Sequence, residues 1–289
     1  TKLTFKLRQG VKWHDGVPFT AKDVKCTFDM LMDKSPAKFR KNPRKTWYDN
    51  VTEVTVNGDY EATFNLKRPQ PALLALLASG YSPVYPCHVS PADMRTHPIG
   101  TGPFKFVEFK QNESIKLTRN PDYWKPGRPY LDGIEFTIIP YRSTAILAFV
   151  AGKFDITFPT EVNIPLLKDV KSQDPKAVCV VAPTNVSTNL IVNRDAPPFN
   201  NAELRRAMAL TLDRKAFIKI LFEGQGDIGG AMLPGPDGVW GLPPDIMKTI
   251  PGYGDDVKQN RAEARKIMEA QGYGPDKRLK VKVSTRNIP

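Results

Sequence analysis

The side chains that could do chemistry in this chain are few and widely spaced. The three histidines are His14, His88 and His97, and none has a partner at the i, i+4 spacing that suits a metal ion. No G-x-S-x-G motif occurs, and no serine or cysteine has a recognisable catalytic histidine context. Carboxylates are plentiful, but only geometry makes a pair of them catalytic. The sequence therefore predicts no catalytic residues, no metal site and no cofactor.

Gly224, Gly226 and Gly229 match the G-x-G-x-x-G spacing of a dinucleotide-binding loop. That motif requires a strand before it and a helix after it, because the phosphates bind at the start of the helix. Here a helical pattern precedes the glycines and a proline-rich stretch follows them. We interpret this segment as a loop.

Aromatic side chains near turns are the more informative class. Such rings suit a site for varied organic ligands, because they offer large contact areas at a low cost in entropy. Packing in the core or at corners is the alternative interpretation for any one of them. The aromatic residues concerned are Trp13, Trp47, Tyr48, Tyr81, Tyr85, Tyr123, Trp124 and Trp240.

The cysteines are Cys26, Cys87 and Cys179, and their spacing matches no metal motif. Cys26 lies in a helical pattern and Cys179 in a strand pattern, so buried free thiols are one interpretation. In an exported protein two of them could pair, and an odd count also allows a partner outside this sequence. The sequence leaves these three alternatives open.

The net charge of +12 raises the question of a nucleic-acid partner. The densest basic cluster is KFRKNPRK, residues 38–45, which contains Phe39 as its only aromatic residue and has no RNA-binding or zinc-finger pattern nearby. We therefore expect a solvated basic loop and no nucleic-acid binding.

Turn and capping signals organise the first half of the chain. Thr20 and Asp23 have the spacing of a capping box, which predicts a helix start. Asn57-Gly58 separates two alternating runs, and this dipeptide favours the tight turn of a hairpin. The other elements expected here are a strand at 3–7, a short helix at 71–77, a hairpin of 104–109 with 114–118, and a strand at 134–139.

The second half combines helical patterns with short apolar runs. Ser143 is expected to cap a helix that ends at Gly152, and Asn200 or Asn201 to cap a long helix over 204–222. Another amphipathic helix is expected at 261–270. The runs expected to form strands are 154–158, 178–181, 189–192 and 279–283. This alternation of strands and helices indicates an α/β fold.

The longest apolar run, residues 72–78, is far shorter than the ~20 residues of a spanning helix. No signal peptide pattern opens the sequence, which begins and ends in strand-like patterns. These features are typical of a piece of a longer protein.

Five segments together resemble the family 5 solute-binding proteins, the peptide- and nickel-type substrate-binding components of bacterial ABC importers. The resemblance covers essentially the whole chain, and the last segment is its most specific part. The segments, in order, are LTFKLRQGVKWHDGVPFTAKDV, NGDYEATFNLKRP, GTGPFKFVEFKQNESIKLTRNPDYW, LAFVAGKFDI and NLIVNRDAPPFNNAELRRAMALTLDR.

The resemblance implies a type II periplasmic-binding-protein architecture, in which two lobes with a small extra subdomain close around a cleft by hinge motion. Residues 1–98 would form the small subdomain of the first lobe, 99–185 part of that lobe's main sheet, and 186–289 the start of the second lobe. Family members are considerably longer, so we expect this chain to lack N-terminal and C-terminal parts and to be incomplete as a fold. Open sheet edges would then favour self-association.

The same resemblance implies a periplasmic protein that delivers a small-molecule or peptide ligand to the ABC permease subunits in the membrane. Segment 185–193 would lie at the crossover between lobes, so polar groups there suit an amide or carboxylate ligand. The candidate ligand-binding residues are Asn185, Ser187, Thr188, Asn189, Trp47 and Tyr81. In peptide-binding members the residues that hold the ligand's termini lie largely in the missing parts.

An oligopeptide or dipeptide is the commonest ligand of such proteins, and nickel complexes, sugars and opines are alternatives. An enzyme on the same scaffold is a different hypothesis, and it requires a carboxylate or histidine with a strongly shifted pKa in a cleft.

Overall fold

The computed structural model describes residues 1–158, 162–182, 186, 188–231 and 241–285. The chain divides into two units, Thr1–Ile138 and Ile139–Pro289. The three-part division expected at residues 98 and 185 stays a prediction about the complete architecture.

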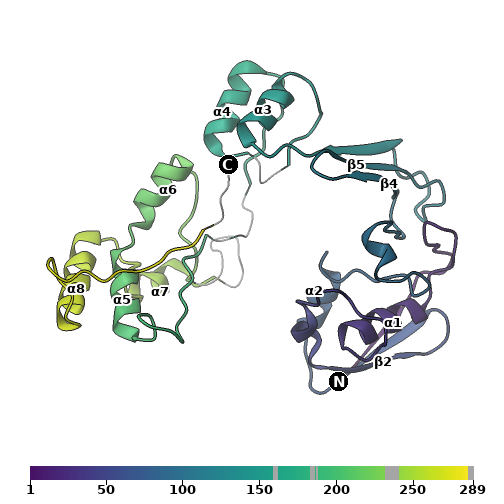
Figure 1. The fold of residues 1–289 in the computed structure, drawn as a ribbon, viewed down its shortest axis with the longest axis horizontal. Helices are drawn as coiled ribbons and strands as arrows, with labels where there is room; N and C mark the ends of the chain where they lie inside the picture. The colour runs from purple at the N-terminus through teal and green to yellow at the C-terminus, as the bar shows by residue number, and fades with distance from the viewer. Residues whose placement is uncertain (159–161, 183–185, 187, 232–240, 286–289) are drawn as a thin grey trace. The chain divides into compact units, whose positions relative to one another are not determined.

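The first unit begins with a three-stranded antiparallel sheet, in the order β1-β3-β2. Helix α1 packs on this sheet (Figure 1). The core between them includes Val24, Phe28, Val54 and Phe64, all at most 6% exposed. The elements are β1 (Lys2–Lys6), α1 (Ala21–Leu31), η1 (Lys45–Tyr48), β2 (Val51–Val56), β3 (Glu61–Leu66), α2 (Leu73–Ala78) and η2 (Asp93–Arg95).

Local signals in the sequence explain these elements. Thr20 caps α1 and forms a complete capping box with Asp23, as expected. The β2–β3 hairpin turns at Asn57-Gly58. Gly58 has a φ of +98°, a backbone conformation that would be strained for a residue with a side chain. Both predictions are confirmed.

A second antiparallel sheet completes the first unit. It contains β4 (Phe104–Lys110), β5 (Ser114–Arg119) and β6 (Gly133–Thr137) in that order. The hairpin and the strand expected in this region are therefore confirmed. Gly133 lies so close to β5 that an added Cβ would come within 2.6 Å of the Leu117 carbonyl oxygen.

The described part of the second unit is helical. Helices α5 and α8 lie side by side around Ala207, Leu210 and Ala264, while α3 and α4 pack around Ile146 and Val170 (Figure 1). The helices are α3 (Arg142–Val150), α4 (Ile164–Gln173), α5 (Ala202–Thr211), α6 (Arg214–Phe222), α7 (Pro244–Thr249) and α8 (Val257–Ala270). None of the described helices combines the length and apolarity needed to cross a membrane.

Two helix predictions are corrected. The expected long helix 204–222 is divided into α5 and α6, because Leu212 has an extended ψ of 118° and the Asp213 carboxylate accepts the Ala216 N–H at 2.9 Å. That carboxylate starts a new helix. Helix α3 is capped by Tyr141, which makes no side-chain capping bond, and Ser143 lies inside the helix.

The four apolar runs predicted to be strands in the second half are not assigned to strands. A strand needs a ladder of backbone hydrogen bonds as well as an apolar pattern. Their side chains are correspondingly exposed: Ile156 84%, Val178 89%, Ile191 88% and Val283 70%. Exposed apolar runs of this kind favour pairing with another chain, so self-association stays a prediction.

Candidate functional site

Two of the predicted ligand-binding residues form a pair on the first unit. The rings of Trp47 and Tyr81 meet edge to face, with centroids 6.0 Å apart and an interplanar angle of 89°. Trp47 is 37% exposed and Tyr81 61% exposed, so both rings remain accessible. We call these two residues the aromatic pair.

A buried neighbour anchors each member of the aromatic pair. Tyr48, next to Trp47, is 1% exposed and packs edge to face on Phe28 of α1. Its hydroxyl shares a hydrogen bond of 2.5 Å with the hydroxyl of Ser82, which follows Tyr81. The Ser82 hydroxyl also lies 2.6 Å from the Leu76 carbonyl oxygen, to which it can donate. The exposed rings therefore project from a fixed support.

Arg44 adds a positive charge to the aromatic pair. Its guanidinium carbon lies 4.7 Å from the Tyr81 ring centroid and 5.9 Å from that of Trp47. No carboxylate pairs with Arg44 among the described residues. A cation beside exposed rings can hold a ligand that combines a carboxylate with an apolar or planar group. From the sequence, Arg44 was interpreted only as part of a solvated basic loop. Its position three residues before Trp47 is the one sequence signal that could have linked it to the aromatic pair.

The other candidate residues belong to the second unit. Asn185 and Ser187 lie outside the described residues. Thr188 and Asn189 are exposed and lie in a segment that is not assigned to a helix or a strand. They stay candidate ligand contacts by prediction.

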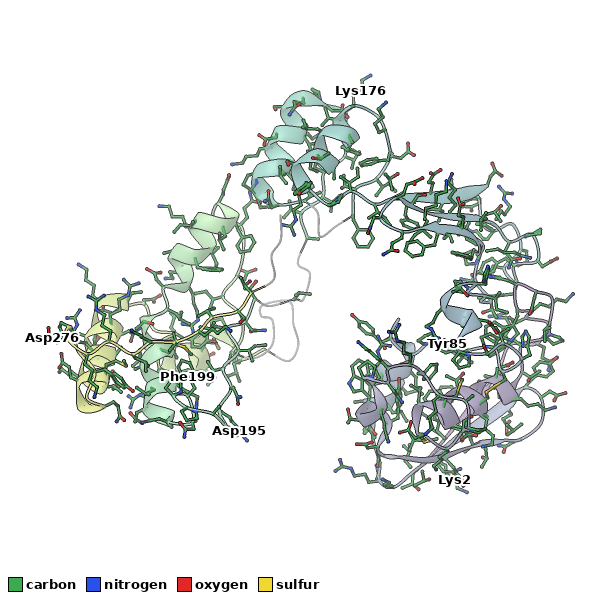
Figure 2. All side chains as sticks on the ribbon, in the orientation of Figure 1. Lys2, Tyr85, Lys176, Asp195, Phe199 and Asp276 are labelled. Atoms are coloured by element: carbon green, nitrogen blue, oxygen red, sulfur yellow. A yellow bond between two sulfur atoms is a disulfide. The ribbon has the colours of Figure 1, made fainter. Side chains whose placement is uncertain are left out.

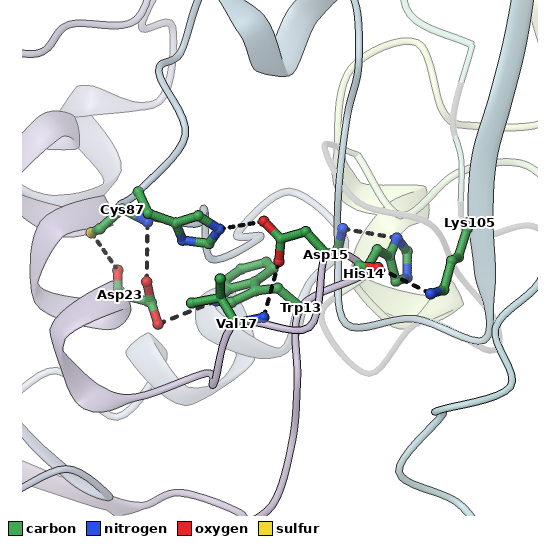
Figure 3. Close-up of polar contacts among 9 residues, drawn as sticks. Trp13, His14, Asp15, Val17, Asp23, Cys87 and Lys105 are labelled. Atoms are coloured by element: carbon green, nitrogen blue, oxygen red, sulfur yellow. Dashed lines mark hydrogen bonds and ion pairs between the residues drawn. The ribbon is translucent and has the colours of Figure 1, made fainter.

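A polar network on the first unit joins Trp13, the capping box of Thr20 and Asp23, and Cys87 (Trp13, Asp23 and Cys87 are labelled in Figure 3). At its centre is Asp23, whose carboxylate is buried and accepts three N–H groups. The donors are the Trp13 indole at 3.3 Å, the Thr20 backbone at 2.9 Å and the Cys87 backbone at 3.0 Å. Asp23 is therefore both the acidic member of the capping box and a structural junction, and the capping signal alone did not reveal the second role.

His14 connects the first turn to the Gly100-Thr-Gly-Pro segment. Its Nδ1 accepts the Gly100 N–H at 3.1 Å, and its Nε2 lies 3.0 Å from the Gly102 carbonyl oxygen. This geometry fits a neutral ring protonated at Nε2. Burial lowers the pKa of His14 below 6.5 and the nearby Lys105 lowers it further, while the Gly102 bond opposes both.

Asp15 lies beside His14 and contacts a second histidine. The His88 Nε2 is 2.6 Å from its carboxylate, which also accepts the Val17 N–H at 3.2 Å. Burial alone would raise the pKa of Asp15, but the hydrogen bonds from His88 and Val17 lower it below 3.8 overall. These bonds, like those of His14, hold turns in place.

We expect the first unit to lose stability as the pH falls, in two steps. The unfolded chain protonates His14 near pH 6.5, whereas the folded chain resists, so stability decreases as the pH falls through this value. Asp15 stabilises the fold above pH 3.8, and this contribution is lost as the pH falls through its lower folded pKa. Urea unfolding at pH 7.5 and 5.5 tests the first step. In a His14→Gln variant, the free energy of unfolding should differ less between the two pH values than it does in the wild-type protein. An equal difference in the two proteins would contradict the assignment of the first step to His14.

The titratable groups of the network are thus occupied by structural contacts. Cys26 and Cys87 form a disulfide, so two of the cysteines pair within the chain, and Cys179 has no disulfide partner among the described residues. In the described residues no group of histidine, cysteine and acidic side chains could hold a metal ion. Gly224, Gly226 and Gly229 lie in a loop after α6, as expected.

Comparison with known proteins places these features in a family. Residues 1–288 match the family described as bacterial extracellular solute-binding proteins, family 5, middle part. The oligopeptide-binding protein AppA of Bacillus subtilis (strain 168) is 30% identical over 279 residues, which are 93% of this chain and 48% of AppA. The chain therefore spans about half the length of this relative.

Solved structures agree with this assignment. AppA of Bacillus subtilis in complex with a nonapeptide superposes with a TM-score of 0.71 at 27% identity, over 93% of this chain and 52% of AppA. The periplasmic binding protein DppA of Helicobacter pylori, in complex with the peptide STSA, has a TM-score of 0.71 at 26% identity, over 94% and 55%. AgaA of A. tumefaciens R10, in complex with agropinic acid, has a TM-score of 0.70 at 25% identity, over 94% and 52%.

These structures share the mixed α/β fold of the periplasmic binding proteins, which confirms the predicted fold class. The chain belongs to the bacterial extracellular solute-binding proteins of family 5.

Proposed function

We propose that this chain is part of the substrate-binding component of a bacterial ABC importer, which captures an oligopeptide or dipeptide and delivers it to the membrane permease. The proposal rests on family membership together with the aromatic pair and Arg44. A peptide offers what this surface can bind, because it combines a terminal carboxylate, planar amides and apolar side chains. Binding and release of an unchanged solute require no nucleophile or base.

A periplasmic location is part of the proposal. The Cys26–Cys87 disulfide supports it, because such bonds persist in oxidising compartments and are rare in the cytosol. The permease is the proposed partner, and stimulation of its ATPase activity by the loaded protein in membrane vesicles would test this step.

An opine is the second candidate ligand. AgaA was solved with agropinic acid, and it resembles this chain about as closely as the peptide-bound structures do. An opine also carries a carboxylate that Arg44 could hold. A thermal-shift screen of the protein at its native length, against di- to pentapeptides and opines, distinguishes the two. A ligand that binds only the folded state raises the melting temperature.

The aromatic pair should matter for affinity and not for stability. We expect Trp47→Ala to raise the Kd of the ligand found in the screen by about tenfold, because the packing of an aromatic ring on an apolar or planar group of the ligand contributes roughly 1–1.5 kcal/mol. Tyr130→Ala is the matched control, since Tyr130 is 71% exposed and has Arg128 3.9 Å from its ring centroid. The Kd of the same ligand for Tyr130→Ala should stay within about twofold of the wild-type value. Titration calorimetry measures both, and equal effects of the two substitutions would contradict the assignment.

A further inference from the structure

A cavity of about 420 Å³ lies on the first unit, between the KFRKNPRK cluster and the region of η2. Its apolar lining comes from Phe39, Tyr85, Pro91 and Met94, all of which are partly buried. The rings of Phe39 and Tyr85 are 4.8 Å apart between centroids and inclined at 56° (Tyr85 is labelled in Figure 2). The volume falls within the range of about 300–1,000 Å³ that is typical of small-ligand sites.

The walls of this cavity are held by bonds to α1 and within the loop. The Tyr85 N–H donates to the Thr27 hydroxyl at 2.8 Å, and Thr27 is fully buried. On the Phe39 side, the Asn42 side-chain amide donates to the Leu31 carbonyl oxygen at 2.7 Å. The Met94 N–H donates to the Ser90 carbonyl oxygen at 3.0 Å. The cavity is therefore preformed, which lowers the entropic cost of binding.

Three exposed cations, Arg40, Lys41 and Arg95, complete the lining, which contains no carboxylate. Among the described residues, Arg95 makes one side-chain hydrogen bond, in which Nη1 donates to the Pro91 carbonyl oxygen at 3.0 Å. In the part of the chain that the structure describes, neither Arg40 nor Lys41 forms an ion pair. The cavity thus combines an apolar interior with unneutralised positive charge.

We propose that this cavity binds a small organic anion that carries an aromatic or branched apolar group. The apolar group packs on Phe39, Tyr85 and Met94, and the carboxylate, sulfonate or phosphate group meets the three cations. A dense basic cluster alone would fit any polyanion. The apolar part of the lining instead favours a compact amphiphilic molecule, because a bare phosphate chain would leave the surface of Phe39, Tyr85 and Met94 uncovered. This inference does not depend on the proposed transport function.

Naphthalene-2-sulfonate is a suitable probe, observed through the methyl signals of methionines labelled with carbon-13. The signal of Met94, assigned by its loss in Met94→Leu, should shift saturably as the probe is added. Neutral 2-naphthalenemethanol should bind about tenfold more weakly, since it lacks the charge-assisted hydrogen bonds.

Charge removal provides the second arm. The double variant Arg40→Gln/Arg95→Gln should raise the Kd of the sulfonate about tenfold. Lys2→Gln/Lys67→Gln, which removes two exposed cations outside the lining, should change it by less than about twofold. An unchanged Kd in the first variant, or a Met94 signal that does not respond, would overturn the proposal. A Met94 shift with phosphatidylglycerol vesicles but not with the free sulfonate would assign the surface to a membrane instead.

Discussion

Replacing Asp23 with alanine is expected to lower the free energy of unfolding of the first unit by about 3–4 kcal/mol. The carboxylate accepts N–H groups from Trp13, Thr20 and Cys87, and it is only 5% exposed. Removing the acceptor leaves donors without partners in a place that water reaches poorly, which costs more than the loss of an average hydrogen bond. The capping interaction of α1 is lost at the same time.

Urea unfolding followed by tryptophan fluorescence measures this effect, because three of the four tryptophans, Trp13, Trp47 and Trp124, belong to the first unit. Asp29→Ala is the matched control on the same helix. Its carboxylate pairs with Lys25 at the surface, so the change should be below about 0.5 kcal/mol. Similar losses in the two variants would show that Asp23 is not a junction.

Loss of the Cys26–Cys87 disulfide is expected to destabilise the first unit by about 4 kcal/mol. The bond joins α1 to the segment before η2, across a sequence separation of 61 residues. In the chain-entropy model, a cross-link stabilises by restricting the unfolded chain, and the effect grows slowly with the length of the closed loop. The same segment carries Tyr85 and His88, so loosening it also affects the cavity and the contact with Asp15.

The measurement compares urea unfolding of the wild-type protein with that of a Cys26→Ala/Cys87→Ala double variant. Cys179→Ala, which changes the free thiol of the second unit, should leave the tryptophan transition in place. A double variant as stable as the wild type would contradict the expectation. Because Asp23 accepts the Cys87 N–H, combining these changes with Asp23→Ala should give a non-additive loss of at least about 0.5 kcal/mol.

Local patterns predicted the first unit well, because its elements depend on residues close in sequence. In the capping box, the side chains of Thr20 and Asp23 accept backbone N–H groups within the same turn. The Asn57-Gly58 turn joins two strands that pair directly with each other. Long-range contacts were not predictable in this way. Nothing in the spacing of His14 and Gly100 indicates that a histidine ring joins them, since the contact depends on the fold around it.

The second unit shows the limit of periodicity. Runs such as 178–181 have the composition of strands, yet a strand also requires a neighbouring backbone, which the pattern of one segment does not encode. The division of the expected helix 204–222 has a local cause, because Asp213 is a strong cap inside a helical pattern. That signal was present in the sequence and was overlooked in favour of the apolar stripe.

The candidate ligand residues were predicted only in part. Turn-associated aromatic residues led to Trp47 and Tyr81, and the structure brings these two together. Arg44 was missed because a dense run of charges is usually a solvated loop, so composition alone gave no reason to separate one arginine from its neighbours. Its position over the rings became evident only from the structure.

We expect the protein to bind a solute without changing it. Titration calorimetry of the protein at its native length, with the ligand identified by thermal shift, tests this claim when the ligand is recovered afterwards and analysed by mass spectrometry. We predict saturable binding of one ligand per protein and recovery of the ligand intact. Conversion of a molar excess of ligand into a product of different mass would contradict this claim and support an enzyme on the same scaffold.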